Sequence, residues 1–332
     1  MGTLQMSLMS NPVSDKLAPR RLYVVLSLRS LPYARHGLQS LLLHSLEELD
    51  IALITDNDED REALLSAASE WDNPNGHAIR IVVKQELDDF EARTFGRLPN
   101  LRSFRHGHPC WRKITDPLLI GTPGEELIIL DPDLYFPNRF LFEATPLQGL
   151  LLMWQKPNCL LPPEVMHRAI DSAILLARHV DIGVAHWRPP PDLDWLDWML
   201  GRLGGPALPQ AMHVEAIVWA AIAMREGGGY LDPRYWKCWQ RTPAKRLLRR
   251  IGFNGGKILE SEPWHDIKCF HAGGEAKWWL AEMEQHGLPG VTREHTEPGD
   301  IRPFVELTPE RYAREEARKR FVRGLDCFQI LR

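Results

Sequence analysis

The stretch Glu126-Leu127-Ile128-Ile129-Leu130-Asp131-Pro132-Asp133 joins a short apolar run to a pair of acidic residues. An apolar run of this length is typical of a strand that is covered on both faces. Residues i and i+2 of an extended chain point to the same side, and Pro132 favours an extended conformation at Asp131. The stretch therefore predicts a buried strand that presents Asp131 and Asp133 together at its carboxyl end.

The sequence before this strand alternates between apolar strands and amphipathic helices. Strands are expected over 21–27, 51–55 and 79–83, and helices over 32–49 and 58–71. Such an alternation is typical of a mostly parallel sheet with helices on both faces. A mostly polar segment, 85–105, and a helix over 110–120 that Pro117 interrupts complete this half. We therefore expect an α/β fold.

The second half of the chain is less regular, with shorter elements and proline-rich loops. A basic amphipathic helix is expected from Thr308 to the C-terminus. No internal repeat is found at a period of 20–50 residues. The remaining expected elements are helices over 164–179, 193–203, 213–226 and 241–250 and strands over 181–185 and 267–270.

The composition excludes several classes of protein. With 44% hydrophobic and 25% charged residues over 332 positions, the chain is expected to be globular. Its net charge of −4 gives no basic footprint for nucleic acid. No apolar run reaches the ~18 residues of a membrane span, and no signal peptide is recognised. Five scattered cysteines without a CxxC pair argue against a disulfide framework, so a cytoplasmic location is expected.

The pair Asp131/Asp133 is the strongest candidate for a metal site. The Asp-x-Asp pattern occurs four times, and helix capping accounts for the copies that begin at Asp56, Asp58 and Asp192. Only the pair at Asp131 follows a long apolar strand, where ligands of open α/β sheets bind. Two carboxylates there suit Mn²⁺ or Mg²⁺, and the alternative is a solvated turn.

A second candidate segment is Lys268-Cys269-Phe270-His271-Ala272-Gly273-Gly274-Glu275-Ala276-Lys277-Trp278-Trp279. A neutral imidazole at His271 can ligate Mn²⁺, and Lys277 can contact phosphate oxygens. Gly273 and Gly274 allow backbone N–H groups to approach a phosphate closely. A lone histidine is more often structural, but its position at a strand end before this run favours a functional role.

Together these two segments resemble the nucleotide-sugar glycosyltransferases of the A-type fold (GT-A). The family that includes glycogenin and the bacterial lipopolysaccharide galactosyl- and glucosyltransferases is the most similar. The resemblance implies that Asp131, Asp133 and His271 bind Mn²⁺ and that Lys277 holds the donor diphosphate. The chain departs from the family pattern at Trp278, where the family usually has proline.

Weaker similarities extend this resemblance over roughly residues 21–280. Leu26 and Ser27 end the strand that lies under the nucleotide base in that family. Arg112 and Lys113 resemble a basic segment near the donor, although a solvated helix face explains them as well. Gly274 belongs to the phosphate-binding run described above.

Three further positions resemble the part of the family that surrounds the donor sugar. Asp181 and Gly183 correspond to an Asn-x-Gly-Val strand, with aspartate in place of asparagine. Glu215 and Ala216 correspond to an Asp-Gln pair, so the family's amide is missing. Stabilisation of the helix N-terminus explains an acidic residue at 215 almost equally well. Glu215 and Asp181 are the only candidates for a catalytic residue or general base.

The implied function is transfer of a sugar from a nucleoside diphosphate, most often UDP in this family, to a saccharide, glycolipid or protein acceptor. A bound cation, His271 and Lys277 would stabilise the departing diphosphate. Retention of the anomeric configuration is implied by the resemblance alone. The implied organisation is a flexible leader at 1–20, a transferase domain at 21–290 with nucleotide and acceptor halves at 21–140 and 141–290, and a C-terminal loop and helix at 291–332.

Two other functions stay open at this point. A nucleotidyltransferase also binds a cation with carboxylates, but it normally needs a glycine-rich loop after the first strand, which residues 28–32 lack. A binding protein on a decayed transferase scaffold would explain the departures at Ala216 and Trp278. The basic stretch at 241–250 could be solvated, or could contact a phosphorylated acceptor or, peripherally, the inner face of a membrane. The same alternatives apply to the basic C-terminal helix, whose Tyr312, Phe321 and Leu325 are expected to pack on the domain rather than enter a membrane surface.

Overall fold

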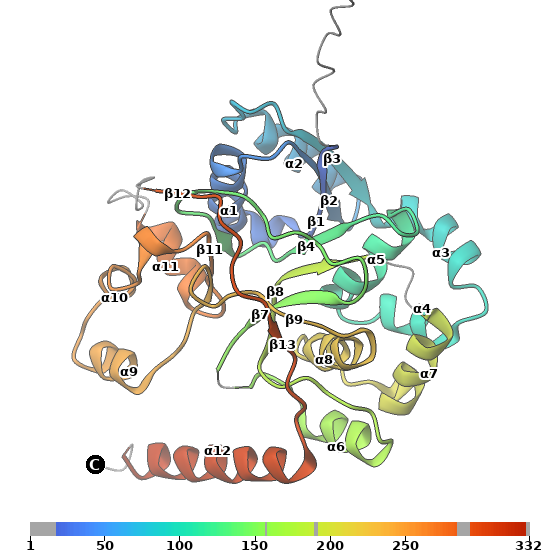
Figure 1. Cartoon of the computed structure of the whole chain (residues 1–332), viewed down its shortest axis with the longest axis vertical. Coiled ribbons are helices and arrows are strands. Elements are labelled where there is room, and N and C mark those ends of the chain that lie inside the picture. Colours follow the sequence, from blue (N-terminus) through green and yellow to red (C-terminus); the bar gives the residue numbers. More distant parts are fainter. Residues whose placement is uncertain (1–17, 157, 189–191, 284–292, 330–332) are drawn as a thin grey trace, which may run out of the picture.

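The computed structural model describes residues 18–156, 158–188, 192–283 and 293–329. Its centre is an eight-stranded sheet in the order β13-β9-β7-β8-β4-β1-β2-β3, with helices on both faces (Figure 1). The strands β1, β2, β3 and β4 are mutually parallel, and β8 and β13 run against their neighbours. The expected α/β fold with a mostly parallel sheet is therefore confirmed.

The first four strands and their connecting helices lie close to where the sequence predicts them. The apolar strands place Tyr23 opposite Ala52 and Ile129 in the middle of the sheet. Helices α1 and α2 pack one face, and α5 lies against the other. The bounds are β1 Arg20–Val25, α1 Leu31–His44, β2 Leu49–Thr55, α2 Asp58–Ser69, β3 Ala78–Val83, α3 Asp88–Thr94, α4 Pro99–Arg105, α5 Arg112–Ile120 and β4 Leu127–Leu130.

Four segments differ from the expected secondary structure. The helix expected over 32–49 ends at His44, and Leu49 already belongs to β2. The polar segment 85–105 holds two short helices, α3 and α4, because Leu101 and Phe104 and their neighbours are buried. Helix α5 continues through Pro117 without a break. The helix expected over 164–179 ends earlier: α6 spans Pro163–Asp171, and a positive φ of 54° at Ala173 turns the chain away from the helix.

The antiparallel strand β8 Val180–Trp187 lies between β4 and β7 Leu150–Trp154. Because β8 runs against both neighbours, its first residues meet the carboxyl ends of β4 and β7 at the same edge of the sheet. Asp131, Asp181 and Gln155 therefore share this edge. The sheet continues through β9 Gly228–Tyr230 to β13 Arg302–Pro303.

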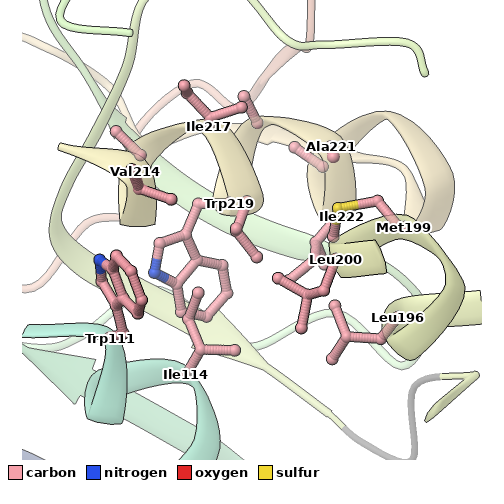
Figure 2. Close-up of a cluster of buried hydrophobic side chains, with 14 of the residues drawn as sticks. Trp111, Ile114, Leu196, Met199, Leu200, Val214, Ile217, Trp219, Ala221 and Ile222 are labelled. Atoms are coloured by element: carbon pink, nitrogen blue, oxygen red, sulfur yellow. The ribbon is translucent and has the colours of Figure 1, made fainter. Parts of the chain in front are cut away.

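A buried cluster fixes the helices that flank this edge (Figure 2). Trp219 lies between the side chains of Trp111 and Ile114 on one side and Leu200 on the other. Helices α7 Leu193–Leu203 and α8 Val214–Glu226 supply most of the apolar surface. Burying several large apolar side chains stabilises this arrangement by roughly 1.5–3 kcal/mol each. It also fixes the first turn of α8 next to α5.

A small second sheet returns the C-terminal part of the chain to β4. Strand β11 Cys269–His271 pairs in parallel with β10 Trp236–Cys238 and antiparallel with β5 Leu134–Tyr135. In this register His271 lies opposite Leu134. The remaining elements are β6 Arg139–Phe140, α9 Pro243–Arg250, α10 Gly255–Leu259, α11 Ala276–Met283, β12 Glu294–His295, α12 Pro309–Gln329 and the short 3-10 helices Leu28–Ser30, Lys84–Leu87, Pro109–Trp111, Gly205–Ala207 and Trp264–Asp266.

None of the described helices is both long enough and apolar enough to cross a membrane. Most of the leader expected at 1–20 and the domain boundary expected at 290/291 lie outside the described residues.

Candidate metal and donor site

Asp131, Asp133 and His271 lie together at the carboxyl edge of the central sheet. Nε2 of His271 is 3.2 Å from Oδ1 of Asp133 and 3.5 Å from Oδ2 of Asp131. The side chains of Asp131, Asp133 and His271 are 11%, 10% and 9% exposed, so the group is largely buried with a small part open to solvent. The structure therefore brings the three predicted metal ligands to one place.

Backbone hydrogen bonds hold the two carboxylates in position. The N–H of Asp131 donates to the carbonyl of Gly183 at 2.8 Å, and the N–H of Ala272 donates to the carbonyl of Asp133 at 2.9 Å. These bonds join the end of β4 to β8 and to β11. The pair is therefore fixed by the strands on either side.

The imidazole of His271 is oriented by Asp181. Oδ1 of Asp181 is 2.7 Å from Nδ1 of His271 and also accepts the N–H of Gly183 at 3.0 Å, while Oδ2 accepts Cys238 Sγ–H at 3.0 Å. With Nδ1–H donating to Asp181, Nε2 faces Asp131 and Asp133. A carboxylate on the second ring nitrogen is the usual partner of a metal-binding histidine.

Gly183 leaves the space that this imidazole occupies. A Cβ at position 183 would lie 2.7 Å from both Cγ and Nδ1 of His271, closer than real Cβ contacts. The donor role expected of Gly183 is untested, but its lack of a side chain is what admits the ring of His271.

The imidazole of His271 and the carboxyl groups of Asp133 and Asp181 stabilise one another in their charged forms. Burial alone would lower the pKa of His271, but the carboxylates of Asp181 and Asp133 raise it well above its usual range. Burial would raise the pKa of Asp133 and of Asp181, yet the imidazolium of His271 lowers both. A proton on His271 thus supplies positive charge at the point where the carboxylates converge.

Lys113 lies on the other side of Asp131. Its Nζ pairs with Oδ1 of Asp131 and is 3.0 Å from Oε2 of Glu215. Trp219 Nε1–H donates to Oε1 of Glu215 at 3.2 Å. Burial raises the pKa of Glu215 to about 8, whereas Asp131 and Glu215 overcome the effect of burial on Lys113 and raise its pKa well above the usual value.

Lys277 reaches the same site from the first turn of α11. Its Nζ is 3.6 Å from Oδ2 of Asp133 and 4.6 Å from the ring centroid of Tyr33. Trp278, the departure from the family pattern, packs edge-on against Tyr33 with the ring centroids 5.1 Å apart. Trp278 therefore supports the aromatic residue that Lys277 contacts.

A pocket of about 190 Å³ opens next to these side chains. Leu26 and Ser27, which directly follow β1, line it. Gly274 has a φ of +67°, which glycine adopts without strain, and nothing lies within 4 Å of the position a Cβ would take. Gly274 is not among the residues that line this pocket. Besides Leu26 and Ser27, the lining residues are Val25, Ser30, Tyr33, Asp56, Pro109, Cys110, Lys113, Asp131, Pro132, Asp133, Met212 and Lys277.

Arg112 does not line this pocket. Its guanidinium donates to Oδ2 of Asp116 at 2.7 Å and to the carbonyl of Thr55 at 3.0 Å, and it pairs with Asp56. These partners tie α5 to the end of β2. Of the two basic residues expected near the donor, only Lys113 faces the pocket.

The possible metal ligands at this site, mostly carboxylate oxygens, suit a hard divalent cation. Four carboxyl groups (Asp131, Asp133, Asp181 and Glu215) face Lys113, Lys277 and His271, so full ionisation leaves one negative charge in surplus, and two once Nε2 of His271 loses its proton to bind a cation. A second group that could ligate, Asp181 with Cys238 and His271, is more deeply buried. Burial raises the pKa of the Cys238 thiol, which therefore stays protonated and donates to Asp181. Asp131, Asp133 and His271, which offer more oxygen ligands, are therefore the better candidate for a divalent-cation site.

Sequence reasoning missed Cys238, Tyr33 and Trp219 as supporting residues. Cys238 lies on β10, whose pairing with β11 no local pattern predicts. Trp219 falls four residues after Glu215, a helical spacing that could have suggested contact between the two. Tyr33 carries no signal in the sequence alone.

No protein-family model matches the sequence, and no curated protein matches it. Several solved glycosyltransferase structures are similar at low identity. Mouse xyloside xylosyltransferase 1, in its apo form, is 12% identical with a TM-score of 0.48, over 78% of this chain and 98% of that chain. LgtC galactosyltransferase with donor and acceptor sugar analogues is 12% identical with a TM-score of 0.46, over 80% and 94%. The apo WbbM bifunctional glycosyltransferase is 11% identical with a TM-score of 0.43, over 84% and 51%.

At this level of similarity, the function of the chain has to be argued from its own site residues.

Proposed function

We propose that the chain is a divalent-cation-dependent glycosyltransferase that uses a nucleoside diphosphate sugar. The observation that carries this proposal is the convergence of Asp131, Asp133 and His271 at a sheet edge, with Lys277 beside Asp133. Such a site offers ligands for a metal ion, and the ammonium group of Lys277 can contact phosphate oxygens. The sequence resemblance to GT-A enzymes over residues 21–280 supports the same assignment.

Asp131, Asp133 and Nε2 of His271 would hold Mn²⁺ or Mg²⁺. The cation would neutralise charge on the diphosphate as the bond between sugar and phosphate breaks. Lys277 can donate from its ammonium group to a phosphate oxygen, because it lies at the exposed rim with 22% of its side chain open to solvent. Leu26 and Ser27 are proposed to lie beneath the nucleotide base, and Gly274 near the diphosphate.

The two candidate catalytic carboxylates have different surroundings. Both oxygens of Asp181 are engaged by His271, Gly183 and Cys238. We therefore assign Asp181 to positioning His271 rather than to proton transfer. Glu215 remains the candidate for contact with the donor sugar, since Lys113 holds one of its oxygens next to Asp131.

We further propose a UDP-sugar as donor and retention of configuration, both from the sequence resemblance. The domain limits of 21–290, with nucleotide and acceptor halves at 21–140 and 141–290, and a cytoplasmic location belong to the same proposal. A saccharide, glycolipid or protein could serve as the acceptor of this activity.

Thermal unfolding with UDP, GDP, CDP or ADP, each with Mn²⁺ or EDTA, tests this function. A ligand at 100 times its dissociation constant stabilises the fold by about 2.7 kcal/mol. We expect one nucleotide, UDP, to raise the Tm in Mn²⁺ only, and Asp133→Asn and His271→Ala to abolish the shift. Asp58→Asn, in an Asp-x-Asp copy away from the site, is the matched control and should respond like the wild type.

UDP release from UDP-sugars, measured on the same proteins, separates an enzyme from a binding protein. A Tm shift without UDP release would leave a sugar-nucleotide-binding protein as the function. No Mn²⁺-dependent shift with any nucleotide would overturn the proposed site.

A further inference from the structure

A second, larger pocket lies at the same edge of the central sheet. It has a volume of about 1140 Å³ and is bordered by α9, by α12 and by the segments that follow β7 and precede β8. Figure 1 shows α9 and α12 at the end of the molecule opposite α2 and β3. This volume lies just above the range of about 300–1,000 Å³ that is usual for ligand pockets.

The walls of this pocket are strongly basic. Among the lining residues that the structure describes, only Glu315 is acidic, and Arg178 pairs with it at 2.6 Å while Asn158 donates to it at 3.3 Å. Burial and then the charge of Arg178 lower the pKa of the lining His179 to about 4, so the imidazole is neutral. The seven cationic residues are Lys156, Arg178, Arg241, Arg246, Arg249, Arg250 and Arg318.

A solvated basic helix would account for α9 alone, but not for this pocket. Lys156, Arg178 and Arg318 come from three other parts of the chain and line the same space. Within α9, Lys245 lies 4.0 Å from the ring centroid of Trp239 and Arg249 lies 5.1 Å from that of Trp279. These contacts hold α9 against the rest of the fold, so this wall of the pocket is fixed by tertiary packing.

The basic pocket adjoins the candidate transfer site through a short chain of contacts. Gln155 directly precedes Lys156, and its Oε1 is 3.5 Å from Sγ of Cys238. The same sulfur donates to Asp181, which holds His271. A molecule bound in the basic pocket would therefore lie on the side of Asp181 and His271 that faces away from the end of β1, where the nucleotide is proposed to bind.

We propose that this pocket binds phosphoryl groups of the acceptor, so that the acceptor is a phosphorylated saccharide. The inference rests on the proposed function, because it takes the neighbouring site to be the site of transfer. Arginine guanidinium groups fit phosphate oxygens in a bidentate manner, and four of the six lining arginines lie on α9 and α12. The phosphate can belong to a free sugar phosphate or to a glycolipid.

Calorimetric titration of inorganic pyrophosphate in metal-free buffer tests the pocket without involving the cation site. We expect saturable binding that weakens as salt is added. The double variant Arg246→Gln/Arg250→Gln should weaken it by about tenfold or more, since two charged contacts to phosphate are lost. The control Arg202→Gln/Arg225→Gln removes two exposed arginines of α7 and α8 that do not line the pocket, and it should bind like the wild type.

The Mn²⁺-dependent thermal shift with UDP separates failure of this inference from failure of the proposed function. All four arginine substitutions should leave that shift unchanged. Absence of pyrophosphate binding, or binding that the Arg246/Arg250 variant does not weaken, would overturn the phosphoryl pocket even where the UDP shift persists.

Vesicles distinguish the two sources of phosphate. Co-sedimentation with phosphatidylglycerol vesicles but not phosphatidylcholine vesicles, lost in the same double variant and accompanied by pyrophosphate binding, supports a glycolipid acceptor. Pyrophosphate binding without vesicle binding supports a free sugar phosphate. Vesicle binding without pyrophosphate binding would make this face a membrane-contact surface and overturn the inference.

Discussion

Oδ1 of Asp181 lies 2.7 Å from Nδ1 of His271, on the opposite side of the imidazole from Asp131 and Asp133. Asp181 is itself held by the N–H of Gly183 and by the thiol of Cys238. The position of Nε2, and with it the third metal ligand, is therefore set by a residue that does not face the pocket.

Replacing Asp181 with asparagine should weaken metal binding without removing a ligand. The amide oxygen of Asp181→Asn can still accept from Nδ1–H, but the negative charge that strengthens His271 as a ligand is lost. Residues that hydrogen-bond to a metal-binding histidine typically contribute 10–100-fold to metal affinity. We expect the Kd for Mn²⁺, measured by titration followed by electron paramagnetic resonance, to rise within that range. An unchanged Kd would contradict the positioning role.

The Gly183→Ala substitution should displace the imidazole. Its Cβ would lie 2.7 Å from Cγ and Nδ1 of His271, and strands on both sides prevent an easy shift. We expect a folded protein that binds Mn²⁺ at least tenfold more weakly. The matched control is Gly273→Ala, whose Cβ would lie 3.8 Å from Cε1 and Nε2 of the same ring, an ordinary contact. Equal Mn²⁺ affinities for the two variants would argue against this steric role.

The fold and the metal ligands could be predicted because their signals are local in the sequence. A run of apolar residues indicates a buried strand. Once that strand is placed, Asp131 and Asp133 must point to the same side, because they are two residues apart in an extended chain. The segment around His271 was found by its motif. Its approach to Asp133 depends on the pairing of β11 with β5, which no local pattern specifies.

The supporting contacts could not be predicted because they arise from tertiary packing. Lys113 and Glu215 meet only because α5 and α8 share the buried cluster around Trp219. Helix α6 ends early because burial of Ile174 and Leu176 requires a turn at Ala173. Strand β7 was not among the expected elements, although residues 150–154 are apolar. A short apolar run is consistent with several structures until its neighbours are known.

Stability should fall on acidification because His186 is buried in neutral form. Burial lowers its pKa to about 3, against about 6.5 in an unfolded chain. Between these values the unfolded state binds a proton that the folded state does not, so stability is complete above about pH 6.5 and is lost as the pH falls toward 3. Each pH unit in this window costs about 1.4 kcal/mol for this residue.

Urea unfolding at pH 7.5 and pH 5 measures this loss. The variant His186→Gln should depend on pH less steeply than the wild type, by about 2 kcal/mol between these two values. The difference in slope is the diagnostic quantity, because loss of the contact with Thr145, at 3.3 Å, lowers stability at both pH values. Identical slopes would show that His186 is not the group responsible.

Lys113 should be the most costly of the site residues to neutralise. Its ammonium group lies between the buried carboxyl groups of Asp131 and Glu215, so Lys113→Met leaves Glu215 without its cation and Asp131 with only the imidazole of His271, 3.5 Å away. Removing one partner of a buried ion pair typically costs about 3–5 kcal/mol, and we expect a loss of that size in urea unfolding without metal. Glu215→Gln should cost less, because Asp131 still pairs with Lys113. In the Lys113→Met background it should restore stability, because Glu215, whose pKa is about 8 even beside Lys113, otherwise has to take up a proton on folding. Additive effects of the two substitutions would contradict the direct coupling of Lys113 and Glu215.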